Sequence, residues 1–245
     1  MHINLKDRVQ LQVQKWVSLL VFPLLFSILI FWLKFIKKYR IQNLKAIRQQ
    51  FKQIKQSSPN GLLICPNHLT FLDSMILMWA FSTPWSYLMN FRTLCWNLPK
   101  ASHVKASKLY RAICFLGKCI LIEADTKASK LTMDKASYLL NKGHYVMVFP
   151  EGTRSKTGKI NTENFIYGVG KLHIDSGLKQ LLCVYLRGKS QTTASKMPKN
   201  SEQFTINMQL LEASSEQTGR RAMRAVATQM IDTLVEMESQ YYAVK

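Results

Sequence analysis

Two side chains that are common in acid–base catalysis, His68 and Asp73, stand five residues apart in the stretch 65–73, which reads CPNHLTFLD. In one regular helix they would point about 140° apart, because an α-helix has about 3.6 residues per turn. The pair can meet only if His68 lies in the turn before a helix and Asp73 reaches back from the first helical turn. The carboxylate would then orient the imidazole so that its other nitrogen can act as a base. A helix start capped by polar groups, without chemistry, is the alternative interpretation.

A second stretch, residues 149–155, reads FPEGTRS and has the residue types of an anion-binding loop. Gly152 lets backbone N–H groups approach an anion, and the hydroxyl of Thr153 adds a further donor. Arg154 offers a planar fork of donors that suits a phosphate. The carboxylate of Glu151 can accept a hydrogen bond from a ligand hydroxyl. A solvated basic turn is the alternative interpretation of this stretch.

Alternating strand and helix patterns surround both stretches. We expect strands at 62–66, 85–90, 119–123, 145–149, 180–186 and 203–210, and helices at 72–82, 105–116, 127–142, 164–176 and 216–240. Strands separated by helices of this length predict an α/β fold with a central, mostly parallel sheet flanked by helices. Ligands of such sheets bind beyond the carboxyl ends of the strands, where both stretches are expected to lie.

The N-terminal part of the chain has the composition of a membrane-associated segment. Residues 16–33 carry no charge and are long enough to cross a hydrocarbon core of about 30 Å as a helix. Trp16 and Trp32 stand near the two ends, where aromatic belts form. Pro23 leaves both a single span and a monotopic, half-inserted helix open. A buried core helix is the alternative, and it would need a larger domain to cover it.

The flanks of this segment differ in charge. Lys and Arg are more frequent after residue 33 than before residue 16, which predicts that the body of the protein lies on the cytoplasmic face of a membrane. We expect this membrane to be the inner membrane of a bacterium. Residues 40–56 form a basic amphipathic pattern that could lie on an anionic leaflet. We therefore divide the chain into a membrane-attachment segment, 1–56, and an α/β domain, 57–245, that holds both candidate stretches.

The whole chain is strongly basic. Its 34 Lys and Arg against 14 Asp and Glu give a formal net charge of +20, so its partners are expected to be anionic: nucleic acid, an anionic membrane or phosphorylated small molecules. The five cysteines show no C-x-x-C spacing and are expected to be reduced thiols of a cytosol-facing protein. The spacing of His, Asp and Glu predicts no metal site.

Taken together, the motifs resemble those of a known family. His68 and Asp73 after a Pro-Asn pair, followed about eighty residues later by the stretch 149–155, closely resemble the glycerolipid acyltransferase superfamily. The best-known branch of this superfamily is that of the 1-acylglycerol-3-phosphate acyltransferases (PlsC-like). The resemblance runs from about residue 60 to about residue 190 and includes residues 164–168, which are similar to the family's Phe-x-x-Gly entry to a helix.

The resemblance implies an enzyme that moves a fatty acyl group from acyl-CoA or acyl carrier protein to the hydroxyl of a lysophospholipid, making phosphatidic acid from 1-acylglycerol-3-phosphate. It implies that His68 is the general base and that Asp73 orients it. The residues that would bind the phosphate of the acceptor are Glu151, Gly152, Thr153 and Arg154. The thioester is a co-substrate and no further cofactor is implied. The expected partners are membrane lipids and the acyl donor, and no nucleic acid is expected.

One departure from the family concerns the acceptor. The family's middle motif ends in an Arg that contacts the acceptor phosphate, and Ala124 stands at the matching position. Lys118, Lys127 or Arg154 would have to compensate, or the acceptor is another lipid or aryl hydroxyl or amine. Lys105, in a stretch similar to the family's Val-x-Lys segment, is a candidate contact for the oxyanion or the phosphate, with Lys108 competing. A non-catalytic, membrane-tethered anion-binding protein is the more distant alternative, and it would not need His68.

Overall fold

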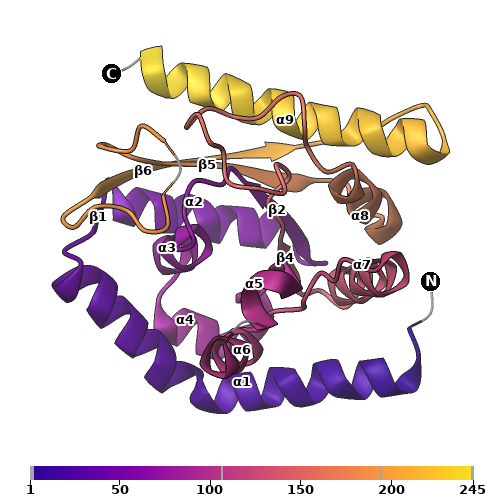
Figure 1. Ribbon diagram of the computed structural model, residues 1–245, viewed down its shortest axis with the longest axis horizontal. Helices are drawn as coiled ribbons and strands as arrows, with labels where there is room; N and C mark the ends of the chain where they lie inside the picture. The colour runs from indigo at the N-terminus through magenta and orange to yellow at the C-terminus, as the bar shows by residue number, and fades with distance from the viewer. Residues whose placement is uncertain (1–2, 106, 194, 244–245) are drawn as a thin grey trace.

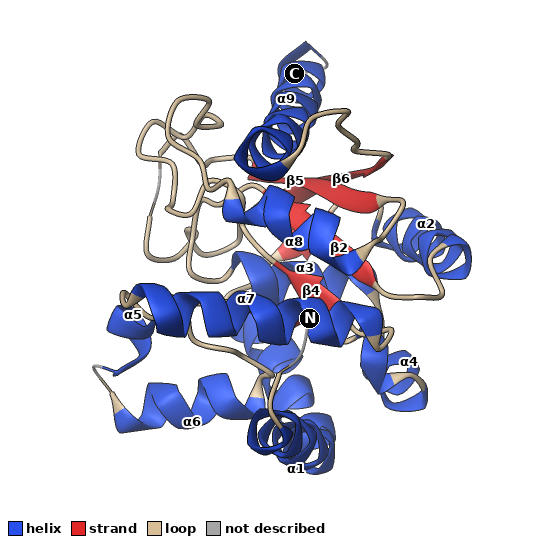
Figure 2. Cartoon of the chain, turned by 90° about the vertical axis from the view of Figure 1, so that its right-hand side faces the viewer, coloured by secondary structure: helices blue, strands red, loops and turns tan. Residues whose placement is uncertain are grey.

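The computed structural model describes residues 3–105, 107–193 and 195–243, and its centre is a curled sheet with helices on both faces (Figures 1 and 2). The strands of this described part are β1 (Arg40–Ile41), β2 (Leu62–Pro66), β3 (Trp96–Asn97), β4 (Tyr145–Met147), β5 (Leu181–Gly188) and β6 (Gln203–Leu211). Their order in the sheet is β1-β6-β5-β2-β4-β3. Neighbouring strands are parallel except for β5 and β6. The predicted α/β class with a mostly parallel sheet is therefore confirmed.

The helices of the described residues connect these strands. They are α1 (Leu5–Phe31), α2 (Leu44–Ser57), α3 (Asp73–Phe81), α4 (Pro84–Met89), α5 (Ala101–Lys105), α6 (Lys108–Leu116), α7 (Thr126–Asn141), α8 (Gly168–Ser176) and α9 (Gly219–Ala243). A π-helical turn, η1 (Trp32–Ile36), continues α1, and a 3₁₀ turn, η2 (Phe91–Thr93), follows α4. The α1 helix runs through Pro23 without a break.

The sheet separates two apolar cores. Leu63 and Cys65 of β2 pack in the core that α7, α8 and α9 complete. Leu62 and Ile64, which alternate with them, pack in the core that α2 and α3 complete. Strands buried on both faces read as continuous apolar runs, which is why β2 and β5 were recognisable in the sequence.

Three details of the predicted elements were wrong. Residues 85–90 were expected to form a strand but belong mostly to α4, which Pro84 starts and the hydroxyl of Thr83 caps by accepting from the Ser86 N–H at 3.2 Å. Residues 119–123 make two isolated bridges to neighbouring backbone and no regular strand among the described residues. The helix expected at 105–116 is present as α6 but begins later, at Lys108, where the Ser107 side chain caps it, and the separate helix α5 precedes it.

The amphipathic helix α2 packs inside the body of the protein. Its apolar residues Ile47, Phe51 and Ile54 are buried, and the ring of Phe51 stacks on that of Phe81 at 4.4 Å. The sequence pattern suggested that this helix could lie on an anionic leaflet, but its apolar face is covered by the core and is not available for insertion into a leaflet. The preceding strand, β1, pairs with β6 and forms an edge of the sheet.

Three loops meet at one end of the sheet because β2, β4 and β5 run parallel and end there. We call them the first loop (residues 67–72), the second loop (148–167) and the third loop (189–202). Asn67 fastens the first loop to β5: its side chain accepts from the Leu186 N–H at 2.7 Å and donates to the Leu186 carbonyl at 3.1 Å. The two predicted chemical stretches therefore lie on neighbouring loops.

Candidate active site

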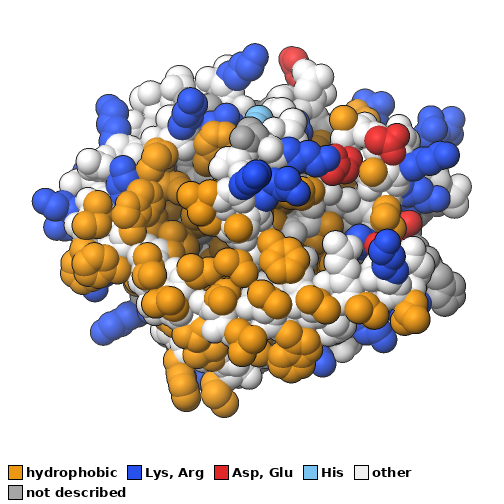
Figure 3. All heavy atoms as spheres, turned by 60° about the horizontal axis from the view of Figure 1, so that its bottom comes forward, with side chains coloured by type: hydrophobic (Ala, Val, Ile, Leu, Met, Phe, Trp, Pro, Cys, Tyr) orange, Lys and Arg blue, Asp and Glu red, His pale blue; other side chains and the backbone are white. Residues whose placement is uncertain are grey.

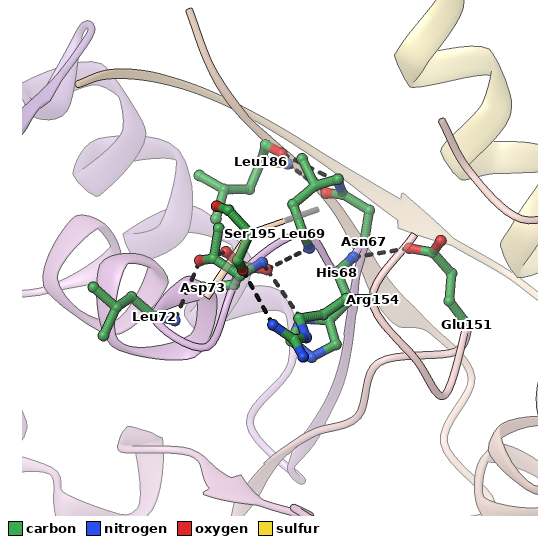
Figure 4. A network of polar contacts seen from close by, with 10 residues as sticks. Asn67, His68, Leu69, Leu72, Asp73, Glu151, Arg154, Leu186 and Ser195 are labelled. Carbon is green, nitrogen blue, oxygen red and sulfur yellow. Dashed lines mark hydrogen bonds and ion pairs between the residues drawn. The ribbon is translucent and has the colours of Figure 1, made fainter. Parts of the chain in front are cut away.

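His68 and Asp73 form the pair that the sequence predicted. His68 lies in the first loop and Asp73 is the first residue of α3. The His68 Nδ1 and the Asp73 Oδ2 are 3.0 Å apart (Figure 4). The same oxygen accepts the backbone N–H groups of Leu69 at 2.6 Å and Thr70 at 2.8 Å. The buried carboxylate thus shapes the first loop and orients the imidazole.

The imidazole of His68 is held on its face as well as at its Nδ1 edge. Its ring stacks on Phe149 of the second loop, with the ring centroids 4.0 Å apart. The side chain is 19% exposed, and no described residue hydrogen-bonds to its Nε2 atom. This leaves one ring nitrogen available to a ligand while the other is engaged by Asp73.

The second loop also holds the backbone of His68 from both sides. The His68 N–H donates to Glu151 Oε1 at 2.8 Å, and its carbonyl accepts from the Ser155 N–H at 3.0 Å. The other oxygen of Glu151 accepts from the Asn161 N–H at 3.2 Å. Both carboxylate oxygens are thus bonded to backbone amides of the protein itself. Burial raises the pKa of Glu151 to about 7, against the lowering effect of these two hydrogen bonds.

Arg154 is positioned by the first and third loops. Its guanidinium lies over the ring of Phe71, 4.0 Å from the centroid, and its Nη1 donates to the carbonyl of Ser195 at 3.1 Å. The first and third loops are joined by backbone bonds from Phe71 to Lys196 and from Ser195 to Leu69. Stacking and one carbonyl fix the plane of the guanidinium, which has further N–H donors.

Gly152 and Thr153 form the turn between Glu151 and Arg154. Gly152 has a φ of +65°, and a Cβ atom there would collide with the Ile166 side chain. Its N–H donates to the Phe149 carbonyl at 3.0 Å. Thr153 is exposed at the tip of the turn. The glycine is therefore required by the backbone conformation and by the close approach of Ile166.

Two lysines considered from the sequence have other partners. Lys105 on α5 forms an ion pair with Glu123, with 2.8 Å between Nζ and Oε2. Lys118 is fully buried, and its ammonium donates to the backbone carbonyls of Phe91 at 3.0 Å and Leu94. Lys118 is therefore not available to bind a ligand. Of the other two candidates, Lys127 is exposed on α7 and Arg154 faces the loops just described.

The structure adds three residues that the sequence did not single out. Phe149 stacks on the catalytic candidate His68, Phe71 supports Arg154, and Ser195 binds Arg154 from the third loop. Phe149 and Phe71 lie inside the two recognised stretches, so an aromatic residue beside each polar motif was a usable signal. Ser195 follows the expected strand 180–186, and only the rule that ligands bind beyond strand ends pointed to its loop.

Comparison with known proteins agrees with this arrangement. A search among curated proteins found no significant match. A family model described as Acyltransferase matches residues 38–186, which include β2, the His68 and Asp73 pair, the turn at 151–154 and most of β5. Because the match covers more than half of the chain and contains both motifs, the chain belongs to the Acyltransferase family, that of the glycerolipid acyltransferases.

Proposed function

We propose that the protein transfers a fatty acyl group from the thioester of acyl-CoA or acyl carrier protein to the hydroxyl of a lysophospholipid, with 1-acylglycerol-3-phosphate as the acceptor and phosphatidic acid as the product. The observation that carries this proposal is the 3.0 Å contact between His68 Nδ1 and the buried Asp73 carboxylate, with the Nε2 edge left open.

In the proposed reaction His68 Nε2 takes the proton of the acceptor hydroxyl while that oxygen attacks the thioester carbonyl. The new C–O bond forms a tetrahedral intermediate, the C–S bond then breaks, and the imidazolium returns its proton to the leaving thiolate. Asp73 keeps the proton of the neutral ring on Nδ1 and stabilises the imidazolium, as a carboxylate partner does for a catalytic histidine. A positioned base of this kind contributes about 10²–10⁴-fold to the rate.

We assign a positioning role to Glu151 and an anion-binding role to Arg154. Glu151 holds the backbone of His68 through one oxygen and accepts the Asn161 N–H through the other. Its side chain is buried, which favours this positioning role over direct contact with the acceptor. Arg154 retains N–H donors beyond the one given to Ser195, and a phosphate can accept them. Thr153, exposed beside it, supplies a hydroxyl.

The second candidate function keeps the chemistry and changes the acceptor. Ala124 stands where the family's phosphate-contacting Arg is expected, Lys118 is committed to two carbonyls, and Lys105 is paired with Glu123. These observations favour an acceptor without a phosphate, such as another lipid or aryl hydroxyl or amine. Arg154 would then face the carrier group of the donor or a lipid head group.

The general-base role is tested with His68→Ala and His68→Asn in an assay with radiolabelled acyl-CoA. Asparagine can keep a donor to Asp73 but cannot accept and return a proton, so both variants should lose about 10²–10⁴-fold in kcat. Circular dichroism should show that both remain folded. Unchanged transfer by either variant would remove His68 from the mechanism.

The acceptor is tested with a matched panel. Lysophosphatidic acid, its phosphate-free counterpart monoacylglycerol, and an amine acceptor are offered to the wild-type protein and to Arg154→Gln. If the phosphate is recognised, only lysophosphatidic acid should lose kcat/KM in the variant. Equal use of phosphate and phosphate-free acceptors would favour the second candidate function.

We also propose that the protein is attached to a membrane through α1, with its body on the cytoplasmic face. The helix is long and apolar enough for such a role, and the basic residues that follow residue 33 favour the anionic cytoplasmic leaflet. Because β1 and α2 belong to the sheet and its core, we now restrict the attachment segment to α1 and η1.

A further inference from the structure

The α1 helix presents a continuous apolar stripe away from the body of the protein. The exposed large side chains recur every three or four residues, which places them on one face of a helix. They are Leu5, Val9, Val13, Trp16, Leu20, Leu24, Ile28, Phe31 and, in η1, Phe35. Leu20 is the most exposed of them at 81%. A soluble protein would bury this stripe and expose the opposite face.

The opposite face of α1 carries three buried polar residues along its first half, beside the buried Leu11, and these polar residues are bonded to the body. Gln14 donates from Nε2 to the carbonyls of Phe115 at 3.0 Å and Cys119 at 2.9 Å. Ser18 donates to the same Phe115 carbonyl at 3.3 Å. Asp7 pairs with Lys135 of α7 at 2.7 Å, and both side chains are largely buried. Further along, Phe22 and Phe26 pack on Tyr87 and Phe91.

These bonds bear on whether α1 crosses a bilayer or lies along its surface. A helix that left the body to cross a membrane would carry Asp7, Gln14 and Ser18 into or through the hydrocarbon without these partners, and a buried polar group that loses its partner costs about 1–3 kcal/mol. A docked helix keeps every one of these bonds. In the docked position its 27 residues extend about 40 Å along the surface of the protein.

Two neighbouring helices extend the apolar stripe sideways. Trp85 and Met89 of α4 are 71% and 72% exposed, and Leu109 and Ile113 of α6 are 71% and 44% exposed. Both helices contact α1. Figure 3 shows apolar side chains gathered over this face, with Lys and Arg side chains around it. The apolar face therefore has the width of more than one helix.

The charges of this part of the chain match an anionic surface. Residues 1–122 contain seventeen Lys and Arg and two acidic residues, Asp7 and Asp73. Both carboxylates are buried, so this half of the sequence has no exposed acidic side chain among its described residues. Lys34, Arg92, Lys108 and Arg111 are exposed next to the apolar residues in sequence. A second copy of so basic a surface would be repelled, whereas an anionic leaflet would be attracted.

We propose that α1 lies in the plane of a single leaflet of an anionic membrane, docked to the body through Asp7, Gln14 and Ser18 and inserted through its apolar stripe, with α4 and α6 beside it in the same leaflet. The protein is thus monotopic, and its chain does not cross the bilayer through α1. This inference deepens the membrane attachment proposed above and does not involve His68.

Depth measurements with spin labels test the orientation. Cysteines replace Val13, Leu20, Leu24 and Phe31 one at a time in the full chain, which is bound to vesicles of phosphatidylcholine and phosphatidylglycerol. Collision with oxygen and with a water-soluble nickel complex then gives the depth of each label. An in-plane helix places all four labels in the lipid at one depth. A crossing helix would change the depth by about 1.5 Å per residue from 13 to 31, and that result would overturn the proposal.

The aqueous reference is Glu216→Cys, an exposed position just before α9, which lies on the other side of the molecule from α1 (Figure 1). The wild-type chain, treated with the same spin label, gives the background from its own five cysteines. Labels on the stripe that are shielded from both lipid and water would indicate a protein partner or a second copy and would also overturn the proposal.

Vesicle flotation supplies a test with a matched control. Leu20→Glu with Leu24→Glu should reduce binding to anionic vesicles by at least tenfold, whereas Ile174→Glu, an exposed apolar residue of α8, should not. Equal binding by the stripe variant and the control would contradict the proposal. Because His68→Ala should bind vesicles like the wild type, the failure of this inference and the failure of the proposed reaction are distinguishable.

Discussion

At the residue scale, the Asp73 carboxylate binds other groups besides the imidazole of His68 that it orients. It also accepts hydrogen bonds from the backbone N–H groups of Leu69 and Thr70 and from the Thr70 hydroxyl. A carboxylate that organises a loop in this way contributes to stability, apart from the role in the reaction that we propose for it. The two members of the pair should therefore respond differently to substitution.

We expect Asp73→Ala to lower both acyl transfer and the free energy of unfolding, the latter by about 2–4 kcal/mol, because hydrogen bonds to a charged group are each worth about 1.5–3 kcal/mol. His68→Ala should lose activity and lower the free energy of unfolding by only about 1 kcal/mol, the value of an aromatic contact such as that with Phe149. Urea denaturation and the acyl-transfer assay, applied to both variants, check this. Equal destabilisation by the two substitutions would contradict it.

The buried carboxylate of Glu151 should make stability depend on pH. Burial raises its pKa from 4.5 to about 7, so between these values the folded protein holds a proton that the unfolded chain has released. The contribution of Glu151 to stability is then fully present below pH 4.5 and is lost as the pH rises through about 7. Relative to Glu151→Gln, the wild-type protein should lose free energy of unfolding between pH 5 and pH 8, measured by urea denaturation. Parallel curves for the two proteins would exclude this effect.

The sequence predicted the polar members of the site and not their supports. The spacing of His68 and Asp73 allowed a single geometry, a loop followed by a helix start, and that geometry is present. The pattern around Glu151 suggested an acceptor for a ligand hydroxyl, and its bonds to the His68 and Asn161 amides depend on how two loops pack together. Local spacing holds no information on such a contact between distant segments.

At the scale of the elements, the turn of the second loop offers a controlled test. Gly152 and Gly177 both have positive φ angles, +65° and +62°, but a Cβ atom collides with Ile166 only at Gly152 and meets nothing within 4 Å at Gly177. Alanine should cost about 1–2 kcal/mol of unfolding free energy at each position through backbone strain. Gly152→Ala should in addition lose activity, because the turn carries Glu151 and Arg154.

The double variant Gly152→Ala with Ile166→Ala removes the collision and keeps the strain. Activity should recover in part, and Gly177→Ala should keep full activity throughout. If Gly152→Ala and Gly177→Ala were equally active, the close packing of the second loop on Ile166 would have no part in shaping the site.

Elements buried on both faces were the most predictable. The strand at 62–66 was predicted with its observed bounds, since a short apolar run between a Gly and a Pro-Asn turn is typical of a buried strand. Residues 85–90 were taken for a strand because they are apolar and aromatic, whereas Pro84 and the Thr83 cap begin a helix there. The short strand at 96–97 was missed because two residues show no period, and its pairing with β4 is a tertiary contact.

At the scale of the whole molecule, the net charge of +20 should govern binding to membranes. Lys108→Glu with Arg111→Glu reverses two exposed charges beside the apolar residues of α6, and a basic residue near an anionic surface is worth about 1 kcal/mol. Binding to anionic vesicles should fall by roughly 30-fold or more, since about 1.4 kcal/mol is tenfold. Raising the salt concentration should also weaken the binding of the wild-type protein to anionic vesicles, because salt screens the attraction between the charges.

Arg220→Glu with Arg221→Glu on α9 makes the same change of charge at exposed positions on the other side of the molecule and should have a much smaller effect. Flotation with vesicles at two salt concentrations measures both variants. Identical losses for the two pairs would mean that net charge acts without a preferred face.

The third loop has a consequence for exchanging parts between enzymes of this family. The carbonyl of Ser195 holds Arg154, and the strand β6 that follows completes the sheet beside β5, yet both lie beyond residue 186, where the family match ends. A chimera joined at that boundary would combine the motifs of one parent with the arginine support of the other. A junction after residue 211, the end of β6, would take both the Arg154 guanidinium and the Ser195 carbonyl from the same parent protein.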